Sequence, residues 1–187
     1  MSKVIEKPAT YQDLLEVPDY LVAEIIDGEL VTSPRPAVPH ANTAGALHSE
    51  LHHRLQRGHG CSPDWWFLIE PELHLAGDVL VPDVAGWRKE HMQRLPNAPA
   101  IDVAPDWICE VISVKTALLD RARKLPRYAR NGVPSAWIVD PVMHTIEIYR
   151  LENDRASAVV TIPASGAVVA EPFAPCELDL NDLWLPE

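Results

Sequence analysis

The sequence has few cysteines and no long hydrophobic run. Its three cysteines, Cys61, Cys109 and Cys176, are scattered and show neither zinc-finger nor disulfide-framework spacing. We therefore expect free thiols and a reducing cytoplasmic location. No apolar stretch approaches the roughly 20 residues that a membrane-spanning helix needs. Residues 1–12 contain no apolar signal core, so we expect neither export nor membrane insertion.

Positive charge is also scarce. The chain has 16 Lys and Arg against 27 Asp and Glu, which gives a formal net charge of -11. Because binding to phosphates needs Lys and Arg, this balance argues against a general nucleic-acid binder. A local basic surface on one predicted helix is still compatible with it, although the same charges also fit a solvated helix face. These basic residues are Arg121, Arg123, Lys124, Arg127 and Arg130.

The remaining composition is that of a globular protein. Hydrophobic residues make up 47% and charged residues 23% of 187 residues, which is enough for a full core. We find no repeat and no linker, so residues 1–187 are interpreted as a single domain.

Residues 105–141 form the most informative stretch, with the pattern strand, helix, strand. Residues 107–112 are an apolar run that suits a strand buried on both faces, and residues 136–139 form a second one. Asn131 and Gly132 end the helix between them. This order predicts a crossover between two parallel strands, and thus an α/β (α+β) fold.

The helix of this stretch carries two stripes. Leu118, Ala122, Leu125 and Ala129 recur at helical spacing, which predicts a face packed on the sheet. Asp120, Lys124 and Tyr128 form a polar stripe beside it, from which Lys124 could reach Glu110. Pro126 should bend the helix, either as a tolerated surface kink or as a kink that aims Lys124.

Other segments give weaker signals. Asp27-Gly28 between residues 21–26 and 29–32 predicts an N-terminal β-hairpin. Glu24 of this hairpin either faces solvent or points to the site, and we expect the solvent face. Further expected elements are a helix at 41–57, one strand at 65–75 bent at Pro71, strands at 79–84, 145–151 and 158–162, and a loop at 87–101.

Three residues could carry chemistry together. Asp83 stands near a predicted strand end, Glu110 interrupts the next buried strand, and Lys124 lies on the following helix. Two carboxylates from adjacent strands would form an oxygen site for Mg²⁺ or Mn²⁺, and a lysine beside them could stabilise charge at phosphorus. These are the groups that phosphodiester hydrolysis needs. A buried ion pair with Lys124 explains the same residues without a metal.

The chain resembles the Uma2 family, bacterial proteins with a restriction-endonuclease-like fold of the PD-(D/E)xK type. The similar segments, in order, are 24–31, the helix start at His40, 70–88, 105–113, 120–141 and 171–184. The resemblance implies a mixed β-sheet flanked by helices and a nuclease-like activity.

The resemblance also implies roles for single residues. The first active-site acid would be Asp83 and the second Glu110, both as metal ligands. In the PD-(D/E)xK pattern a lysine stands two residues after the second acid, and this chain has Ile112 at that position. The lysine is therefore expected to have moved to Lys124, with Lys115 as a rival. Glu70 and His40 would support the site. From the stripe and the basic charge of the central helix, we also expect Asp120 to support the site and Arg121 and Arg127 to contact phosphates.

Two functions follow from these observations. The first is a metal-dependent DNA endonuclease that acts as a homodimer. The second is a non-catalytic binding or assembly module that keeps the fold, suggested by the acidic composition and by Trp87 and Trp184 as interface residues.

Overall fold

The computed structural model describes residues 7–152, 154–163 and 165–185, so the ends of the expected domain, 1–6 and 186–187, lie outside it. The helical elements are α1 (Tyr11–Leu15), α2 (Val38–Leu51), η1 (His52–Gln56), α3 (Ala117–Leu119), η2 (Asp120–Lys124), α4 (Leu125–Arg130) and η3 (Asn181–Leu183). The strands are β1 (Leu21–Ile26), β2 (Glu29–Pro34), β3 (Trp65–Ile69), β4 (Leu73–Leu75), β5 (Asp78–Leu80), β6 (Val84–Arg88), β7 (Trp107–Val111), β8 (Ser135–Asp140), β9 (Thr145–Glu152), β10 (Arg155–Pro163), β11 (Ala167–Val169) and β12 (Glu177–Asp179).

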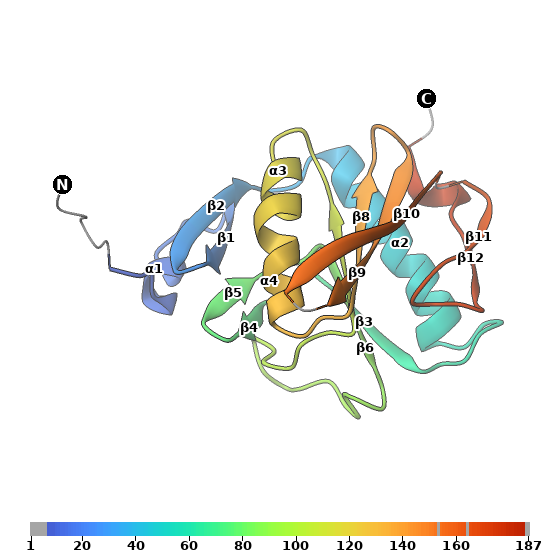
Figure 1. Ribbon diagram of the computed structural model, residues 1–187, viewed down its shortest axis with the longest axis horizontal. Coiled ribbons are helices and arrows are strands. Elements are labelled where there is room, and N and C mark those ends of the chain that lie inside the picture. Colours follow the sequence, from blue (N-terminus) through green and yellow to red (C-terminus); the bar gives the residue numbers. More distant parts are fainter. Residues whose placement is uncertain (1–6, 153, 164, 186–187) are drawn as a thin grey trace.

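The strands form three sheets. The central one is six-stranded and mixed, in the order β10-β9-β8-β7-β6-β3, and only β7 and β8 within it are parallel. A four-stranded antiparallel sheet, β2-β1-β5-β4, contains the predicted N-terminal hairpin. A small β11-β12 ribbon lies near the C-terminus (Figure 1). The mixed sheet flanked by helices confirms the fold class expected from the sequence.

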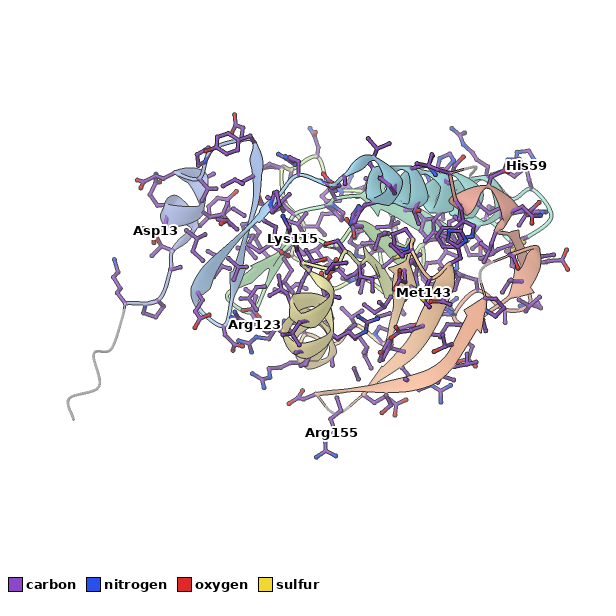
Figure 2. The ribbon with its side chains drawn as sticks, turned by 90° about the horizontal axis from the view of Figure 1, so that it is seen from above. Asp13, His59, Lys115, Arg123, Met143 and Arg155 are labelled. Atoms are coloured by element: carbon purple, nitrogen blue, oxygen red, sulfur yellow. A yellow bond between two sulfur atoms is a disulfide. The ribbon has the colours of Figure 1, made fainter. Side chains whose placement is uncertain are left out.

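Helices cover both faces of the central sheet. Figure 2, seen from above, shows α2 in cyan and the α3–α4 segment in yellow on opposite sides of the strands. Because side chains alternate along a strand, Trp107, Cys109 and Val111 of β7 pack toward α2, and Ile108 packs toward α4. Glu110 falls on the α4 face between two apolar neighbours, so its burial follows from strand geometry.

The parallel pair and its crossover match the expectation from residues 105–141. Glu110 pairs with Ile138 across the two strands. Gly132 ends the helix with φ +83°, a left-handed conformation that glycine adopts without strain. The predicted apolar face of this helix is wrong in its first half, because Leu118 and Ala122 are exposed and Asp120 and Lys124 are buried instead.

Three expected elements differ from the structure. Residues 65–75 form two strands in different sheets, since Glu70 takes φ +45° before Pro71 and the chain turns there. Residues 79–84 do not form one strand, because the chain leaves β5 at Val81 and enters β6 at Val84. Trp87 is fully buried in β6 rather than in a loop, and so cannot serve as an interface residue in this fold.

The cysteine prediction is also wrong. Cys61 and Cys176 form a disulfide although 115 residues separate them, and only Cys109 is free and buried. The bond joins the loop after η1 to the segment before β12, which packs against α2. Cysteine spacing in the sequence could not predict this disulfide, because the two loops come together only in the folded chain and no local motif marks them.

Within the part of the chain that the structure describes, no helix has the length and apolar character that crossing a bilayer requires.

Candidate active site

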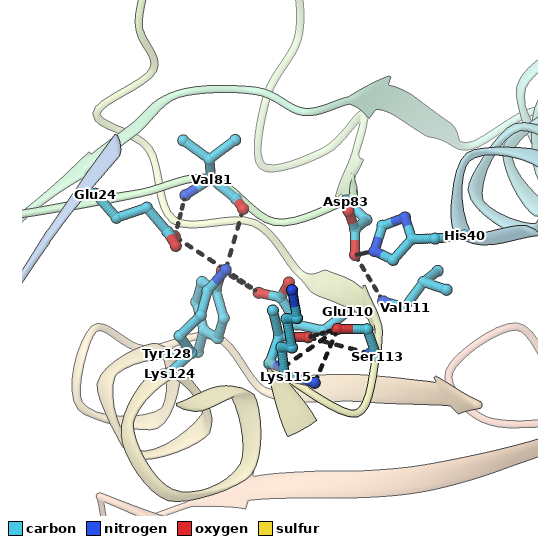
Figure 3. A network of polar contacts seen from close by, with 11 residues as sticks. Glu24, His40, Val81, Asp83, Glu110, Val111, Ser113, Lys115, Lys124 and Tyr128 are labelled. Atoms are coloured by element: carbon cyan, nitrogen blue, oxygen red, sulfur yellow. Dashed lines mark hydrogen bonds and ion pairs between the residues drawn. The ribbon is translucent and has the colours of Figure 1, made fainter. Parts of the chain in front are cut away.

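The predicted catalytic residues line one cavity of about 490 Å³. Asp83 comes from the β5–β6 connection, Glu110 from β7 and Lys124 from η2. The cavity also contains the other expected site residues, which are Glu70, His40 and Asp120. Chain segments more than 80 residues apart thus contribute to a single group of titratable side chains, most of which are drawn in Figure 3.

Lys124 is the centre of this group. Its Nζ donates to Glu24 Oε1 at 2.9 Å, to Glu110 Oε1 at 2.8 Å and to the carbonyl oxygen of Val81 at 3.1 Å. An ammonium group has three protons, so these three acceptors satisfy it completely. Burial lowers the pKa of Lys124, but Glu110 and Glu24 more than compensate, and the pKa is raised. Lys124 is therefore a fixed positive charge.

Glu110 is buried, and its side chain is 4% exposed. Burial raises the pKa of Glu110 well above its usual range, and the charge of Lys124 only partly opposes this effect. The hydroxyl of Tyr128 donates to Glu110 Oε1 at 2.7 Å. The predicted stripe of Asp120, Lys124 and Tyr128 thus points inward to the cavity and its walls, and does not flank a packed face.

Asp83 has a different set of partners. Its Oδ2 accepts a hydrogen bond from the backbone N–H of Val111 at 2.6 Å and lies 3.2 Å from Nε2 of His40. Burial lowers the pKa of His40, but the hydrogen bond and charge of Asp83 outweigh it, so the pKa is raised. The other ring nitrogen of His40, Nδ1, is buried without a partner in the described structure. His40 therefore holds Asp83 from the start of α2.

Asp120 and Glu70 complete the acidic lining. Asp120 is buried beside Lys124, and burial raises its pKa to about 6. Glu70 lies nearer to solvent, with Oε2 at 3.7 Å from Arg35. Glu70 thus belongs to the rim of the cavity, and Asp120 to its interior.

The two expected phosphate contacts, Arg121 and Arg127, are engaged elsewhere. The guanidinium group of Arg121 forms an ion pair with Glu147, and that of Arg127 contacts Asp27 and Asp78. Neither arginine lines the cavity. Their proposed contact with phosphates remains a prediction.

Sequence reasoning favoured the wrong side of the hairpin for Glu24. We expected this residue on the solvent side of the hairpin, but it is buried and accepts hydrogen bonds from Lys124 and from the backbone N–H of Val81 at 2.8 Å. The pairing of β1 with β5, at Ile25 and Val79, turns this face of the hairpin inward. The available signal was the family-like segment at residues 24–31, which begins with this glutamate.

The chemistry of the cavity fits a divalent metal ion. Four buried or nearly buried carboxylates, those of Glu24, Asp83, Glu110 and Asp120, share one buried lysine, Lys124, so the interior of the cavity has a deficit of positive charge. Carboxylate oxygens are the ligands that Mg²⁺ and Mn²⁺ prefer. Among the described residues, no three such side chains stand together in a ready-made metal geometry. The oxygen donors and the negative charge of the cavity thus suit a divalent metal ion, and the carboxylate side chains would have to rotate to bind it.

A mixed sheet flanked by helices, with carboxylates and a lysine gathered at the ends of its strands, defines the restriction-endonuclease-like class. The chain belongs to the Uma2 family, described as "Putative restriction endonuclease", whose model matches residues 8–182. The solved structures that match include a "putative nuclease belonging to DUF820" from Anabaena variabilis, with a TM-score of 0.73. That chain is 20% identical, and the match covers 94% of this chain and 97% of that one, which supports the shared fold. No curated protein matches the chain.

Proposed function

We propose that the protein is a metal-dependent endonuclease that hydrolyses phosphodiester bonds in DNA. The single observation that carries this proposal is the convergence of Asp83, Glu110 and Lys124 on one cavity. Membership of the Uma2 family supports the reaction class. The buried position of Trp87 removes one of the two interface residues on which the binding-module alternative depended.

Asp83 and Glu110 would hold Mg²⁺ or Mn²⁺. When bound, such an ion supplies charge for a phosphate oxygen and lowers the pKa of a coordinated water. Lys124 cannot act as a general base, since its raised pKa keeps it protonated. It instead acts as a charged donor that orients a water or a phosphate oxygen. All three of its protons are already used, so Glu110 or another acceptor must turn away before it can do so.

His40, Glu24 and Asp120 have supporting roles in this proposal. His40 fixes Asp83, and Glu24 joins Lys124 to the β5–β6 connection that carries Asp83. The Cys61–Cys176 disulfide removes the argument from free thiols for a cytoplasmic location. We further propose that residues 1–187 form one domain and that the protein acts as a homodimer, so that two sites can cut two strands. Sedimentation velocity at micromolar concentration tests the dimer.

The decisive experiment compares the wild type with Asp83→Asn. We expect the wild type to cleave plasmid or oligonucleotide DNA with Mn²⁺ or Mg²⁺, and to be inactive in EDTA. Asp83→Asn should lose at least about a hundredfold in rate, the scale of removing one transition-state-stabilising group. It should remain folded, because an amide oxygen can still accept the hydrogen bond from Val111.

A thermal melt of the same samples provides a second measurement. Millimolar Mn²⁺ should raise the melting temperature of the wild type and have little effect on Asp83→Asn, because a ligand that binds the folded state stabilises it. Arg130→Gln, which changes an exposed arginine outside the cavity, serves as the matched control. Equal cleavage by the wild type and Asp83→Asn would refute the site.

A further inference from the structure

The central helix does not offer its positive charges to a ligand. Four arginines of this segment are each within 4.0 Å of a carboxylate: Arg121 with Glu147, Arg123 with Glu29, Arg127 with Asp27 and Asp78, and Arg130 with Asp154. These pairs tie the helix to the hairpin sheet and to the β9–β10 hairpin. A DNA phosphate would have to displace an acid at each of them. The cost is small for the exposed pairs of Arg123 and Arg130 and larger for the more buried pairs of Arg121 and Arg127.

The cavity wall offers a different set of cations. Among the described residues that line it, the positively charged ones are Arg35, Lys115 and Lys124. Lys124 is saturated by three acceptors. Arg35 and Lys115 thus remain as the cations that can receive an anion entering from solvent.

Lys115 is the freer of the two. It is exposed, and no carboxylate of the described chain lies within ion-pair distance of it. Its backbone is nevertheless fixed, because its N–H and that of Thr116 each donate to Ser113 Oγ at 3.3 Å. This turn directly follows β7, so Lys115 stands five residues after Glu110, on the Ser113 side of the cluster in Figure 3.

Arg35 is held at another edge of the same cavity, on the connection between β2 and α2. Its Nε and Nη2 donate to the carbonyl oxygen of Asp19 at 3.3 and 2.9 Å, which orients the guanidinium plane. Its Nη1 lies 3.7 Å from Glu70, in a half-exposed pair that contributes little energy. An incoming phosphate can therefore replace Glu70 at small cost.

The start of α2 adds to the positive potential between these residues. Ala37 and His40 line the cavity, no side chain caps the first turn of this 14-residue helix, and no acidic residue occupies that turn. No acid within this turn opposes the positive end of the helix dipole, and the nearby carboxylate is that of Asp83, which reaches His40 from the β5–β6 connection. In a protein with a net charge of -11 and an acidic cavity interior, the cations at the mouth of the cavity decide where a polyanion can approach.

We propose that Lys115 and Arg35 form a phosphate-binding clamp at the mouth of the cavity, which holds the DNA backbone next to the bond to be cut. This inference deepens the proposed function and rests on it. It moves the phosphate contacts from the exposed face of the central helix to two connections, β7–α3 and β2–α2. Both residues bind phosphates and neither takes part in the chemical step.

The test measures binding without cleavage. Wild type, Lys115→Gln, Arg35→Gln and Arg121→Gln are titrated in EDTA against a fluorescently labelled 20-base-pair duplex at several salt concentrations. Arg130→Gln is the control, since it removes one positive charge away from the cavity. Lys115→Gln and Arg35→Gln should each weaken binding about 3- to 10-fold near 0.1 M salt and lower the salt slope by about one unit. Arg121→Gln and Arg130→Gln should change neither value.

Cleavage by the same proteins in Mn²⁺ separates the two proposals. We expect Lys115→Gln to raise KM and leave kcat near that of the wild type. Cleavage by all variants, with unchanged binding in Lys115→Gln and Arg35→Gln, would overturn the clamp and leave the nuclease proposal standing. Weakened binding in these two variants without any cleavage by the wild type would support the clamp and overturn the nuclease. A wild type that neither binds nor cuts DNA overturns both.

Discussion

At the residue scale, the stability of the candidate site depends on how its buried carboxylates are paired with its buried lysine. Glu24 and Glu110 share Lys124 as their buried cation, and the side chains of all three are at most 6% exposed. Isolated buried charges are unstable, so each member of this group requires the others. Changing one member should therefore affect both folding and metal binding.

Lys124→Met should destabilise the protein strongly at pH 8. Removing one partner from a buried ion pair typically costs about 3–5 kcal/mol, because the other charge stays buried. The loss should shrink at pH 5, since the raised pKa of Glu110 allows that carboxyl to become neutral. Urea denaturation at both pH values measures this, with Arg130→Gln as a control that stays within about 0.5 kcal/mol. A loss below about 1 kcal/mol at pH 8 would contradict the assignment.

The raised pKa of Asp120 predicts that the stability of the wild type depends on pH. Burial raises its pKa to about 6 from a usual value of 3.8. Between these values the folded state binds the proton more tightly than the unfolded state, so the free energy of unfolding falls as pH rises. Asp120→Asn mimics the neutral acid and should not show this fall. Its melting temperature should match the wild type near pH 4 and exceed it near pH 8, whereas a constant difference across this range would contradict the prediction.

The sequence could predict which residues are chemically important, but not all of their contacts. Lys124 and Glu110 lie in one strand–helix unit, so their proximity follows from local spacing. The partnership of Lys124 with Glu24 depends on pairing between β1 and β5, which are more than 50 residues apart. No local pattern encodes such a pairing, and for this reason Glu24 was assigned to the solvent side.

At the element scale, the segment from Ala117 to Arg130 contains a structural irregularity that the sequence only partly predicted. Residues Asp120–Lys124 form a π-helical turn, in which the N–H of Leu125 bonds to the carbonyl oxygen of Asp120. Pro126 follows immediately, at the start of α4. Its ring would collide with the carbonyl four residues earlier in a regular helix, which explains the widened turn.

Pro126→Ala tests whether this turn aims Lys124. Alanine restores a backbone N–H and favours a regular α-helix, so the turn should tighten and rotate Lys124 relative to Glu24 and Glu110. We expect cleavage activity to fall at least several-fold, and the melting temperature to fall as well, because the buried ion pairs of Lys124 weaken. Normal activity in Pro126→Ala would show that the proline is a tolerated kink. A circular dichroism spectrum with undiminished helical signal controls for folding.

The same segment shows why helical periodicity misassigned a face. Leu118 and Ala122 fit the apolar stripe but are exposed, because the wide turn shifts the phase between them and Leu125. Periodicity arguments assume 3.6 residues per turn throughout. The second half of the helix, after the irregular turn, followed the prediction, with Leu125 and Ala129 buried.

At the scale of the whole molecule, the disulfide between Cys61 and Cys176 ties the C-terminal segment to the rest of the fold. Additional hydrogen bonds hold this segment on α2, from Asn42 and Thr43 to the carbonyl oxygen of Leu183. Local sequence rules did not anticipate the disulfide, since it depends on the packing of the entire chain. The order of strands in the two larger sheets was equally beyond reach, apart from the β1–β2 hairpin of the four-stranded sheet and the β7–β8 crossover of the central one.

Reduction of the disulfide should lower stability without unfolding the protein. A disulfide typically contributes about 2–4 kcal/mol, and a loop of roughly 100 residues contributes about 4.7 kcal/mol in the chain-entropy model. Cys61→Ser should show the same loss as dithiothreitol treatment of the wild type, and dithiothreitol should add nothing to Cys61→Ser. Urea denaturation measures both, and thiol titration of the unfolded wild type should yield one free cysteine. Three free thiols under non-reducing conditions would contradict the bond.

The positions of the buried charges along the chain also matter during synthesis. Glu24, Asp83, Glu110 and Asp120 all leave the ribosome before Lys124, the buried lysine that balances them. Domains fold as units while the chain emerges from its N-terminus. A nascent chain therefore cannot close its acidic cavity until Lys124 has been translated, and shorter chains lack a complete site while they remain attached to the ribosome.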